Sequence, residues 1–353
     1  MHRLRPAGYN YLFERYPLLG RRLARIHIGC YPTPLQSLEP GLWIKRDDYT
    51  HRVYGGNKVR KLEFLFGQAL QRGCESVVTF GGVGSNHALA TALHARRHEL
   101  GATAMLMPQR YTEFVDATLA RHQSNQTHLT RWSSRRTERI DTLRALRDAA
   151  RGKLAVVPLG GTSAVGSIGY VNAAFELAAQ WPQQLARPTR IYVAAGTMGT
   201  AAGLAVGLQL LNWPTAVIAV QVTVASQVNN AAMDRLCRKI GRRLRAAERG
   251  IPAHIGIDPA VEIRSEYLGT DYADPTSASQ SAVSEARSRW QLPLETTYTG
   301  KAMACLIAEQ ASRKRAEQWL FWHTYSGSPA VSSALSEPTG EYADYRQLLH
   351  HPD

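Results

Sequence analysis

A lysine follows two glycines and an asparagine in the segment YGGNKVRKLEF, residues 54–64. Apolar residues recur after it at helical spacing, so a helix is predicted to begin at or near Lys58, with Asn57 in position to cap it. The unpaired amides and the dipole at a helix start disfavour a second positive charge there. A neutral lysine amine is a nucleophile suited to an aldehyde. The alternative is a lysine that points into water after a glycine turn.

Lysine is rare in this chain, where it accounts for only seven of the 42 basic residues. Arginine cannot lose its proton at working pH or form an imine, whereas lysine can do both in surroundings that disfavour the ammonium. In a chain this rich in arginine, a lysine at this position therefore raises the question of whether its chemistry is required.

A second segment, RIYVAAGTMGTAAGLAVGLQLL, places a turn of small residues between a predicted buried strand and an amphipathic helix. Backbone amides of such a turn, together with the helix N-terminus, bind anions, and threonine hydroxyls add donors. The turn suits a phosphate monoester, and it lacks the G-x-G-x-x-G pattern of dinucleotide sites. A tight connection without a ligand is the alternative. The turn consists of Gly196, Thr197, Met198, Gly199 and Thr200.

A third segment, FGGVGSNHALATAL, carries Ser85 and Asn86 after a glycine-rich turn, again where a helix is predicted to start. Hydroxyl, amide and free backbone donors converge there on an anion such as a carboxylate. The alternative for both residues is simple capping of the helix. His87 by itself is more typical of a structural histidine than of a catalyst.

Short apolar runs alternate with helical patterns along most of the 353 residues, as in ESVVTFGG, KLAVVPLGG, RIYVAAGTMG and TAVIAVQVT. This alternation is typical of parallel sheets with helices on both faces. The chain is predicted to be an α/β protein of two domains, because its length exceeds that of one average domain.

Composition narrows the class of protein. Hydrophobic residues make up 44% and charged residues 20%, as in ordinary soluble proteins. The N-terminal segment carries scattered charges, which predicts a cytoplasmic protein with no membrane partner. Four widely separated cysteines without a Cys-x-x-Cys pattern predict free buried thiols and no metal site. The net charge of +14 is concentrated in runs with helical apolar spacing, which favours solvated helix faces over a specific nucleic-acid site.

The ordered set PTPLQSL, LWIKRDD, GGNKVRKLE, GSNH, PLGGTSAVGSIGYV, TTYTGKAMACLI and LFWHT resembles one family, over about residues 30–330. It is similar to the pyridoxal-phosphate enzymes of fold type II, in the branch of D-cysteine desulfhydrase and 1-aminocyclopropane-1-carboxylate deaminase. The resemblance implies a fold like the tryptophan synthase β chain and a homodimer. It also implies a large cofactor-binding domain, residues 1–60 plus 162–353, and a smaller inserted domain, residues 61–161.

The same resemblance implies roles for individual residues. Lys58 would form the imine with pyridoxal 5'-phosphate and move the α-proton, and Lys61 would be a structural or substrate-side cation. Ser85 would contact the substrate carboxylate, and Asn86 the phenolic oxygen of the cofactor. The turn from Gly196 to Thr200 would hold the phosphate. Tyr298 would lie beside the cofactor ring to orient substrate or pass a proton, and Thr324 would face the pyridine nitrogen.

The chain departs from the family pattern at Gly84, where glutamine is usual, at Leu89, where arginine is common, and at Met198, where glycine is usual. HTYSGSP also replaces the usual His-Thr-Gly-Gly. In the deaminases a glutamate follows the active-site tyrosine, near the pyridine nitrogen, whereas this chain has Thr299, as in the desulfhydrases. The resemblance therefore implies a lyase that converts D-cysteine, or another β-substituted alanine, to pyruvate and ammonia.

Two alternatives stay open for the function. One is deamination of 1-aminocyclopropane-1-carboxylate to 2-oxobutanoate. The other is a catalytically weak protein that binds the cofactor or uses its basic surface to bind nucleic acid. A protein that only binds has no need for a lysine that forms an imine.

Overall fold

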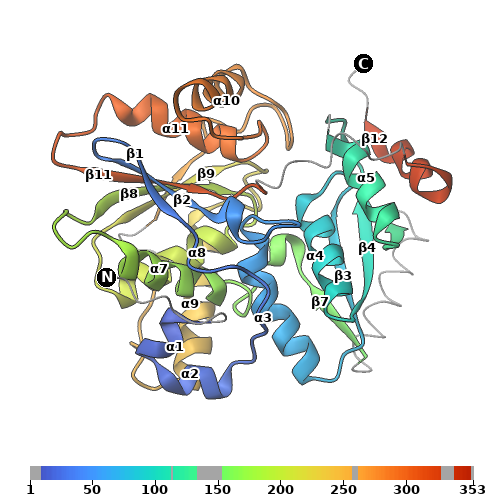
Figure 1. Cartoon of the computed structure of the whole chain (residues 1–353), viewed down its shortest axis with the longest axis horizontal. Coiled ribbons are helices and arrows are strands. Elements are labelled where there is room, and N and C mark those ends of the chain that lie inside the picture. The colour runs from blue at the N-terminus through green and yellow to red at the C-terminus, as the bar shows by residue number, and fades with distance from the viewer. Residues whose placement is uncertain (1–8, 113, 133–152, 257–260, 327–337, 351–353) are drawn as a thin grey trace. The chain divides into compact units, whose positions relative to one another are not determined.

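The structure is a computed structural model, and it describes residues 9–112, 114–132, 153–256, 261–326 and 338–350. These residues form two compact units (Figure 1). The first unit lies within Met1–Phe64 and Thr162–Gly327, and the second within Leu65–Gly161 and Ser328–Asp353.

The first unit is built on a six-stranded sheet with the order β1-β2-β11-β8-β9-β10. All neighbouring strands are parallel except the edge pair β1 and β2, which is antiparallel. The predicted parallel sheet is therefore confirmed, with one antiparallel edge strand added by the short turn between β1 and β2. The strands are β1 (Leu35–Glu39), β2 (Leu42–Arg46), β8 (Pro188–Ala195), β9 (Ala216–Gln221), β10 (Val261–Arg264) and β11 (Gln318–His323).

Side chains of the central strands alternate between two apolar cores, one on each face of this sheet. In β8, Ile191 and Val193 enter one core, while Tyr192 and Ala194 enter the other. A strand buried on both faces reads as a continuous apolar run. This burial explains why RIYVAA carries no polar alternation.

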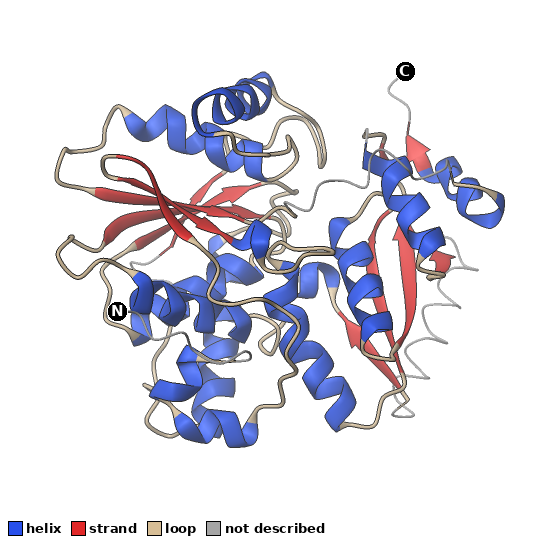
Figure 2. Ribbon diagram, in the orientation of Figure 1, coloured by secondary structure: helices blue, strands red, loops and turns tan. Residues whose placement is uncertain are grey.

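Helices cover both faces of the larger sheet (Figures 1 and 2). One core takes residues from α1, α7, α8 and α9, and the other takes residues from α10 and α11. These helices are α1 (Tyr11–Arg15), α7 (Ile168–Gln180), α8 (Gly199–Leu210), α9 (Asn230–Ala247), α10 (Ser277–Trp290) and α11 (Thr299–Gln310). The unit also contains α2 (Pro17–Arg22) and the 3-10 helix η1 (Asp47–Tyr49).

The second unit has a four-stranded parallel sheet with the order β6-β4-β3-β7. Helices α4 and α5 pack against one of its faces through Ala88, Val115 and Leu119. Its elements are β3 (Ser76–Gly82), α4 (Asn86–Arg97), β4 (Gly101–Met107), α5 (Phe114–Ser124), β6 (His128–Arg131), β7 (Leu154–Val157) and η2 (Leu159–Gly161). Helix α3 (Lys58–Gln71) begins in the first unit and ends in the second.

The C-terminal segment belongs to the second unit, whereas the sequence-based division placed all of 162–353 in the large domain. Strand β12 (Leu349–His350) directly follows the 3-10 helix η3 (Gly340–Leu348) and pairs in parallel with β5 (Gln109–Arg110). Tyr345 and Leu349 also pack against the apolar core beneath α4 and α5. Sequence pattern does not predict this pairing, because a two-residue strand has no periodicity of its own.

All four cysteines are free thiols, as predicted, but only three are buried. Cys30 is exposed, which corrects the expectation of four buried thiols. In the described part of the chain, no helix combines the length and the apolar character needed to cross a bilayer.

Of the two long basic runs of the sequence, the structure describes only the second in full. The run RWSSRRTERIDTLRALRDAARGK lies mostly outside the described residues. The run DRLCRKIGRRLRAAERG forms most of α9, which buries Cys237, Ile240 and Leu244 and exposes basic side chains such as Arg242 and Arg243. This arrangement is the solvated helix face that the sequence favours.

Candidate active site

Three of the predicted site segments of the first unit follow the carboxyl ends of its parallel strands, the edge at which α/β sheets bind ligands. The segment leading to Lys58 follows β2, the turn Gly196–Thr200 follows β8, and Thr324 follows β11. Because neighbouring parallel strands end at the same edge, segments distant in sequence come together there.

Lys58 is the first residue of α3, as its sequence context predicts, and its side chain is half-buried. Its Nζ donates a hydrogen bond to Asn57 Oδ1 at 2.8 Å. Asn57 Nδ2 in turn donates to Thr200 Oγ1 at 3.0 Å. A chain of two hydrogen bonds thus links the lysine to the turn that is predicted to hold a phosphate.

Burial lowers the pKa of Lys58 to about 8, although the nearby Glu295 carboxylate acts in the opposite direction. A lysine at the ordinary pKa of about 10.4 is almost entirely an ammonium at neutral pH. At about pH 8, by contrast, half of the Lys58 side chains carry a free amine. The site therefore supplies a nucleophilic amine near neutral pH.

This pKa predicts how the cofactor-free protein reacts with pyridoxal phosphate. Below about pH 8 the rate of imine formation rises about tenfold per pH unit, because it follows the neutral fraction of Lys58, and above about pH 8 it levels off. Stopped-flow absorbance measures the rate, with Nα-acetyl-lysine amide as the control, whose rate keeps rising toward about pH 10. A protein rate that also keeps rising to about pH 10 contradicts the depressed pKa.

Hydrogen-bond donors gather around the N-terminus of α8. A Cβ on Gly199 would lie 2.5 Å from Thr162 Oγ1, 3.0 Å from Lys61 Nζ and 3.1 Å from Ser167 Oγ. Only glycine fits at this close approach. Thr162 Oγ1 also lies 2.7 Å from Thr197 Oγ1. Hydroxyls, an amine and the start of a helix therefore converge at one point.

These donors fit a phosphate group. Ser167 Oγ is buried without a hydrogen-bond partner among the described residues, and a buried hydroxyl in that state costs free energy unless a ligand satisfies it. Burial and the neighbouring Lys58 lower the pKa of Lys61 well below its ordinary value. A phosphate dianion beside Lys61 would raise this pKa again, because its negative charge stabilises the ammonium form.

Met198 stands where a glycine is usual in the family. The backbone conformation at this position shows why glycine is favoured there. Its φ of 62° and ψ of −9° lie in the left-handed region as the N-cap of α8. A non-glycine residue there costs about 1–2 kcal/mol. The Met198 side chain is buried in the core beneath α8, so apolar contact offsets part of that cost.

Tyr298 lies directly before α11, and its ring packs against the turn that is predicted to hold a phosphate. A Cβ on Gly196 would lie 3.5 Å from the Tyr298 ring, and Lys58 Nζ lies 6.0 Å from the centre of that ring. The hydroxyls of Tyr298 and Tyr272 are hydrogen-bonded to each other. Burial is the main cause that raises the pKa of both phenols, so both stay protonated and one proton of the pair remains available for donation.

Glu295 holds the start of α11. Its carboxylate accepts hydrogen bonds from the backbone N–H of Thr297 at 2.8 Å, of Tyr298 at 3.1 Å and of Thr299 at 2.7 Å. The Thr299 hydroxyl also donates to Glu295 Oε1 at 2.9 Å. A carboxylate at a helix N-terminus satisfies orphan donors and interacts favourably with the dipole. Glu295 thus fixes the backbone that carries Tyr298.

Thr324 is joined to the lysine segment through the backbone. Its carbonyl oxygen accepts the N–H of Asn57 at 3.0 Å. Two residues further on, Ser326 Oγ accepts the N–H of Gly55, also at 3.0 Å. These two hydrogen bonds tie the segment after β11 to the glycine turn before Lys58. The HTYSGSP departure is described only as far as Ser326.

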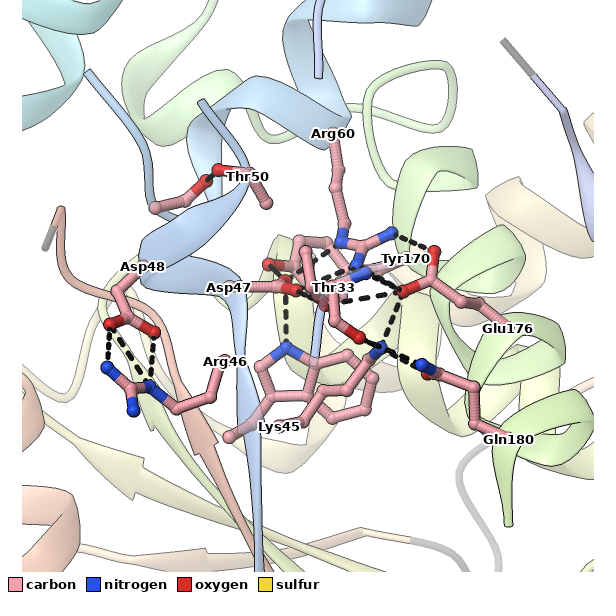
Figure 3. A network of polar contacts seen from close by, with 12 residues as sticks. Thr33, Lys45, Arg46, Asp47, Asp48, Thr50, Arg60, Tyr170, Glu176 and Gln180 are labelled. Atoms are coloured by element: carbon pink, nitrogen blue, oxygen red, sulfur yellow. Dashed lines mark hydrogen bonds and ion pairs between the residues drawn. The ribbon is translucent and has the colours of Figure 1, made fainter. Parts of the chain in front are cut away.

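A buried network of charged side chains anchors the first turns of α3 (Figure 3). The Arg60 guanidinium lies between Asp47 and Glu176 and forms ion pairs with both, and Lys45 forms an ion pair with Glu176. Burial alone would raise the pKa of Glu176, but Arg60 and Lys45 outweigh it and lower that pKa to about 2. Two cations thus balance two anions in the interior. The Asp47 carboxylate also accepts hydrogen bonds from Tyr170, Trp322 and Thr33.

Ser85 and Asn86 lie in the second unit, at the junction of β3 and α4. Ser85 is the N-cap of α4, and its Oγ accepts the N–H of Ala88 at 3.2 Å. The capping role that the sequence offered as an alternative is therefore present. Capping uses Ser85 Oγ as an acceptor and leaves its proton available for donation. Asn86 is half-buried at the first position of the helix.

His87 has the structural surroundings that its sequence context favours. Its Nε2 accepts the N–H of Gly161 at 3.2 Å and lies 2.9 Å from Thr79 Oγ1. Leu89 is buried in the same helix. Neither residue presents a fixed charge at this helix start.

Comparison with known proteins identifies the family of the chain that carries these residues. Residues 26–324 match the model of the family described as "Pyridoxal-phosphate dependent enzyme". The chain belongs to the pyridoxal-phosphate-dependent enzymes. Its predicted cofactor, pyridoxal phosphate, is thereby confirmed.

Within this family, the enzyme is similar to proteins with two different names. It is 32% identical to the D-cysteine desulfhydrase of Salmonella paratyphi A over 328 residues, 88% of this chain and 96% of that protein. It is 31% identical to a Thermotoga maritima protein provisionally named 1-aminocyclopropane-1-carboxylate deaminase over 312 residues, 85% of this chain and 95% of that protein. The solved structure of an "ACC deaminase homologue" matches with a TM-score of 0.75 at 28% identity, over 98% of this chain and 100% of that one. These relatives confirm the predicted fold type and the branch of the family.

Several residues with a place in the site carried no decisive signal in the sequence. Tyr272 reaches Tyr298 from a loop 26 positions away, and neither spacing nor a motif marks it. Glu295 could have been suspected, because an acidic residue shortly before a helix is a capping signal. Lys61, by contrast, is expected from the resemblance as a structural or substrate-side cation, and its Nζ lies near the N-terminus of α8, 3.0 Å from a Cβ built on Gly199.

Proposed function

We propose that this enzyme catalyses β-elimination on a small amino acid, either D-cysteine or another β-substituted alanine. With D-cysteine the products are pyruvate, ammonia and hydrogen sulfide, and one water molecule is consumed. The bond between the β-carbon and sulfur breaks, and its electron pair leaves with the sulfur. Hydrolysis of the remaining carbon–nitrogen bond releases ammonia.

The observation that supports elimination over opening of a cyclopropane ring is the chemistry around Thr299. Where the deaminases carry a glutamate after the tyrosine, Thr299 directs its neutral hydroxyl to Glu295. Thr324, the residue proposed to face the pyridine nitrogen, is also neutral. Without a carboxylate partner that nitrogen loses its proton readily and accepts less electron density. Elimination asks less of this electron sink, because the electrons depart with the sulfur.

When bound, pyridoxal phosphate withdraws electrons from the α-carbon of an amino acid, which makes the α-proton acidic. We assign its phosphate to the turn Gly196–Thr200 together with Lys61 and Ser167. Lys58 is assigned to the covalent link with the cofactor aldehyde, and Asn86 to the phenolic oxygen. The hydroxyl and amine donors described above suit these roles by charge and by burial.

The remaining steps are assigned to side chains of this chain. The neutral amine of Lys58 takes the α-proton, which its depressed pKa permits near neutral pH. Ser85 donates its hydroxyl proton to the substrate carboxylate, since its cap bond uses only a lone pair. Tyr298, held by Tyr272 and Glu295, donates a proton near the substrate at its hydroxyl.

A substrate panel tests the proposed reaction. We expect pyruvate from D-cysteine and from β-chloro-D-alanine, sulfide from D-cysteine, and little or no 2-oxobutanoate from 1-aminocyclopropane-1-carboxylate. Keto acids are measured by coupled dehydrogenase assays, and the L-isomers are run beside the D-isomers. Efficient release of 2-oxobutanoate, with no pyruvate from any β-substituted alanine, would assign the enzyme to the deaminases instead.

For its assembly and location, we propose a homodimer in the cytoplasm, with a small amino acid as the partner that the site binds. The basic surface of α9 is proposed to serve solubility, with no specific nucleic-acid partner. The single acidic residue of that helix supports this view, since Asp234 forms an ion pair with Arg238.

A further inference from the structure

The turn of residues 81–84, which comprises the last two residues of β3 and the two that follow them, contains three glycines, and neighbouring side chains fill the space that they leave. A Cβ on Gly81 would lie 2.4 Å from Ser85 Oγ, and a Cβ on Gly82 would lie 2.2 Å from Gln109 Oε1. Real Cβ atoms do not approach other atoms so closely. Ser85 and Gln109 therefore occupy positions that larger residues at 81 and 82 would exclude.

Gly84, directly before Ser85, is the third glycine of this turn. A Cβ on Gly84 would lie 2.8 Å from Gln109 Nε2 and 3.0 Å from Val115 Cγ2. The φ angle of Gly84 lies outside the left-handed region, so its backbone accepts an ordinary side chain. Contact with the Gln109 carboxamide and the Val115 side chain, rather than backbone strain, therefore limits the size of residue 84.

Gln109 also contacts the turn directly. Its Oε1 accepts the backbone N–H of Gly84 at 3.1 Å, and its side chain is buried, with 7% exposed. A buried carboxamide that accepts a backbone hydrogen bond fixes the local conformation, because losing the acceptor leaves the N–H unsatisfied. Gln109 therefore sets the conformation of the residue that precedes Ser85.

The C-terminal segment holds Gln109 in this place. Leu349 in β12 pairs with Gln109 in β5. Arg346 forms an ion pair with Asp116 at 2.7 Å, and the Tyr342 hydroxyl donates to the carbonyl oxygen of Thr127 at 2.9 Å. These contacts fasten the segment to α5 and to the residue before β6. The short strand that carries Gln109 is thus supported from outside the four-stranded sheet.

We propose that Gln109 is a positioning and specificity-determining residue for the substrate carboxylate. Its carboxamide occupies the space, and supplies the polar group, that a side chain at position 84 would otherwise provide. The inference rests on the proposed function, in which Ser85 donates to that carboxylate. Gln109 acts through the Gly84 backbone on Ser85. Because the Gln109 amide is neutral, it adds no negative charge near the start of α4, where the substrate carboxylate is proposed to bind.

A reciprocal swap tests the spatial part of this proposal. Gly84→Gln brings a side chain against Gln109, and Gln109→Gly removes the acceptor of the Gly84 N–H. We expect each single variant to raise KM for D-cysteine or β-chloro-D-alanine about tenfold, as expected for a lost buried hydrogen bond or a clash. The double variant should return to within about twofold of the wild-type KM, because residues that share one space are strongly coupled. Effects of the single changes that simply multiply in the double variant would overturn the proposal.

Gln109→Glu tests the part that concerns charge, and it does not depend on the swap variants folding. The glutamate keeps an oxygen for the Gly84 N–H but adds a negative charge near the carboxylate. We expect KM to rise at least about tenfold, with kcat nearly unchanged and with the increase reduced by salt. Gln71→Glu makes the same change at an exposed position in the same unit and should leave KM unchanged.

Two further measurements distinguish a failure of this proposal from a failure of the proposed function. Affinity of the cofactor-free variants for pyridoxal phosphate, measured by absorbance titration, should match wild type, because a positioning role toward the carboxylate does not involve the phosphate. Ser85→Ala serves as the reference for the carboxylate site. If Ser85→Ala raises KM and Gln109→Glu does not, only the role of Gln109 is wrong. If neither raises KM, the carboxylate assignment itself is wrong.

Discussion

Lys58→Ala is expected to abolish the visible absorbance of covalently bound pyridoxal phosphate and to lower turnover by about 10³-fold or more, as loss of an essential nucleophile or base does. Alanine cannot form an imine or take a proton, and the Asn57 carboxamide loses its amine partner. Absorbance of the reconstituted protein and keto-acid release measure the two effects. Far-ultraviolet circular dichroism checks that the fold is retained.

Lys239→Ala is the matched control for this variant. Lys239 is exposed on the basic face of α9, so its removal should change neither the absorbance nor the turnover. A Lys58→Ala protein that keeps a borohydride-reducible adduct and substantial turnover would show that another lysine performs this chemistry.

Arg60→Met is expected to have the largest effect on stability. It removes the cation that forms ion pairs with both Asp47 and Glu176. Removing one partner of a buried ion network typically costs about 3–5 kcal/mol, because the other charges stay buried and uncompensated. Lys45 still faces Glu176, so most of the cost falls on Asp47. The free energy of unfolding in urea measures this cost.

The pH dependence of the Arg60→Met effect gives a further check on its cause. In the wild type, burial acts to raise the pKa of Asp47, but Arg60 outweighs it and the pKa is lowered. The ionised carboxylate therefore stabilises the folded state above the unfolded pKa, and this contribution is lost as pH falls through the folded one. Without Arg60, burial raises that pKa above its unfolded value, so the folded state loses stability as pH rises. The deficit of the variant should be larger at neutral pH than near about pH 4, the ordinary range for aspartate.

Arg238→Met provides the comparison for that experiment. Arg238 forms an exposed ion pair with Asp234, and such pairs contribute less than about 1 kcal/mol. Equal costs for Arg60→Met and Arg238→Met would contradict the view that the buried network anchors the start of α3.

Most regular elements of this fold could be predicted from the sequence because their burial leaves a periodic pattern. The runs that become β3, β8 and β9 are apolar almost throughout, since both faces of a central strand are covered. Edge and very short strands leave no such pattern. For this reason β1 joins the larger sheet in an antiparallel direction, and β12 pairs with β5, without a signal in the sequence.

The residues of the candidate site likewise divide into those that leave a local pattern in the sequence and those that do not. The placement of Lys58 and of the turn from Gly196 to Thr200 at helix starts could be predicted, because the start of a helix leaves a local pattern in the sequence. Tyr272 and Gln109 could not, because their contacts depend on tertiary packing across 26 positions to Tyr298 and 25 positions to Gly84. The roles of all these predicted site residues stay predictions: those of Lys58, Ser85, Asn86, Tyr298, Thr324 and the turn from Gly196 to Thr200.

The departures from the family pattern also differ in physical meaning. Met198 keeps the left-handed backbone that favours glycine and gains apolar burial in return. Gly84 leaves a space that Gln109 fills. Leu89 is buried within α4, where it adds to the interior of the second unit. Gly84 and Leu89 therefore change the surroundings of the predicted carboxylate site more than they change the fold.

Mapping of the cofactor adduct tests the central claim, that Lys58 carries the covalent chemistry, most directly. The reconstituted wild-type protein is reduced with borohydride, digested and analysed by mass spectrometry. A single phosphopyridoxyl adduct on Lys58 is the expected result, because its pKa of about 8 leaves a reactive amine that Asn57 links to the turn proposed to hold the phosphate. An adduct found on Lys61 or on any other lysine, with Lys58 unmodified, would contradict the account.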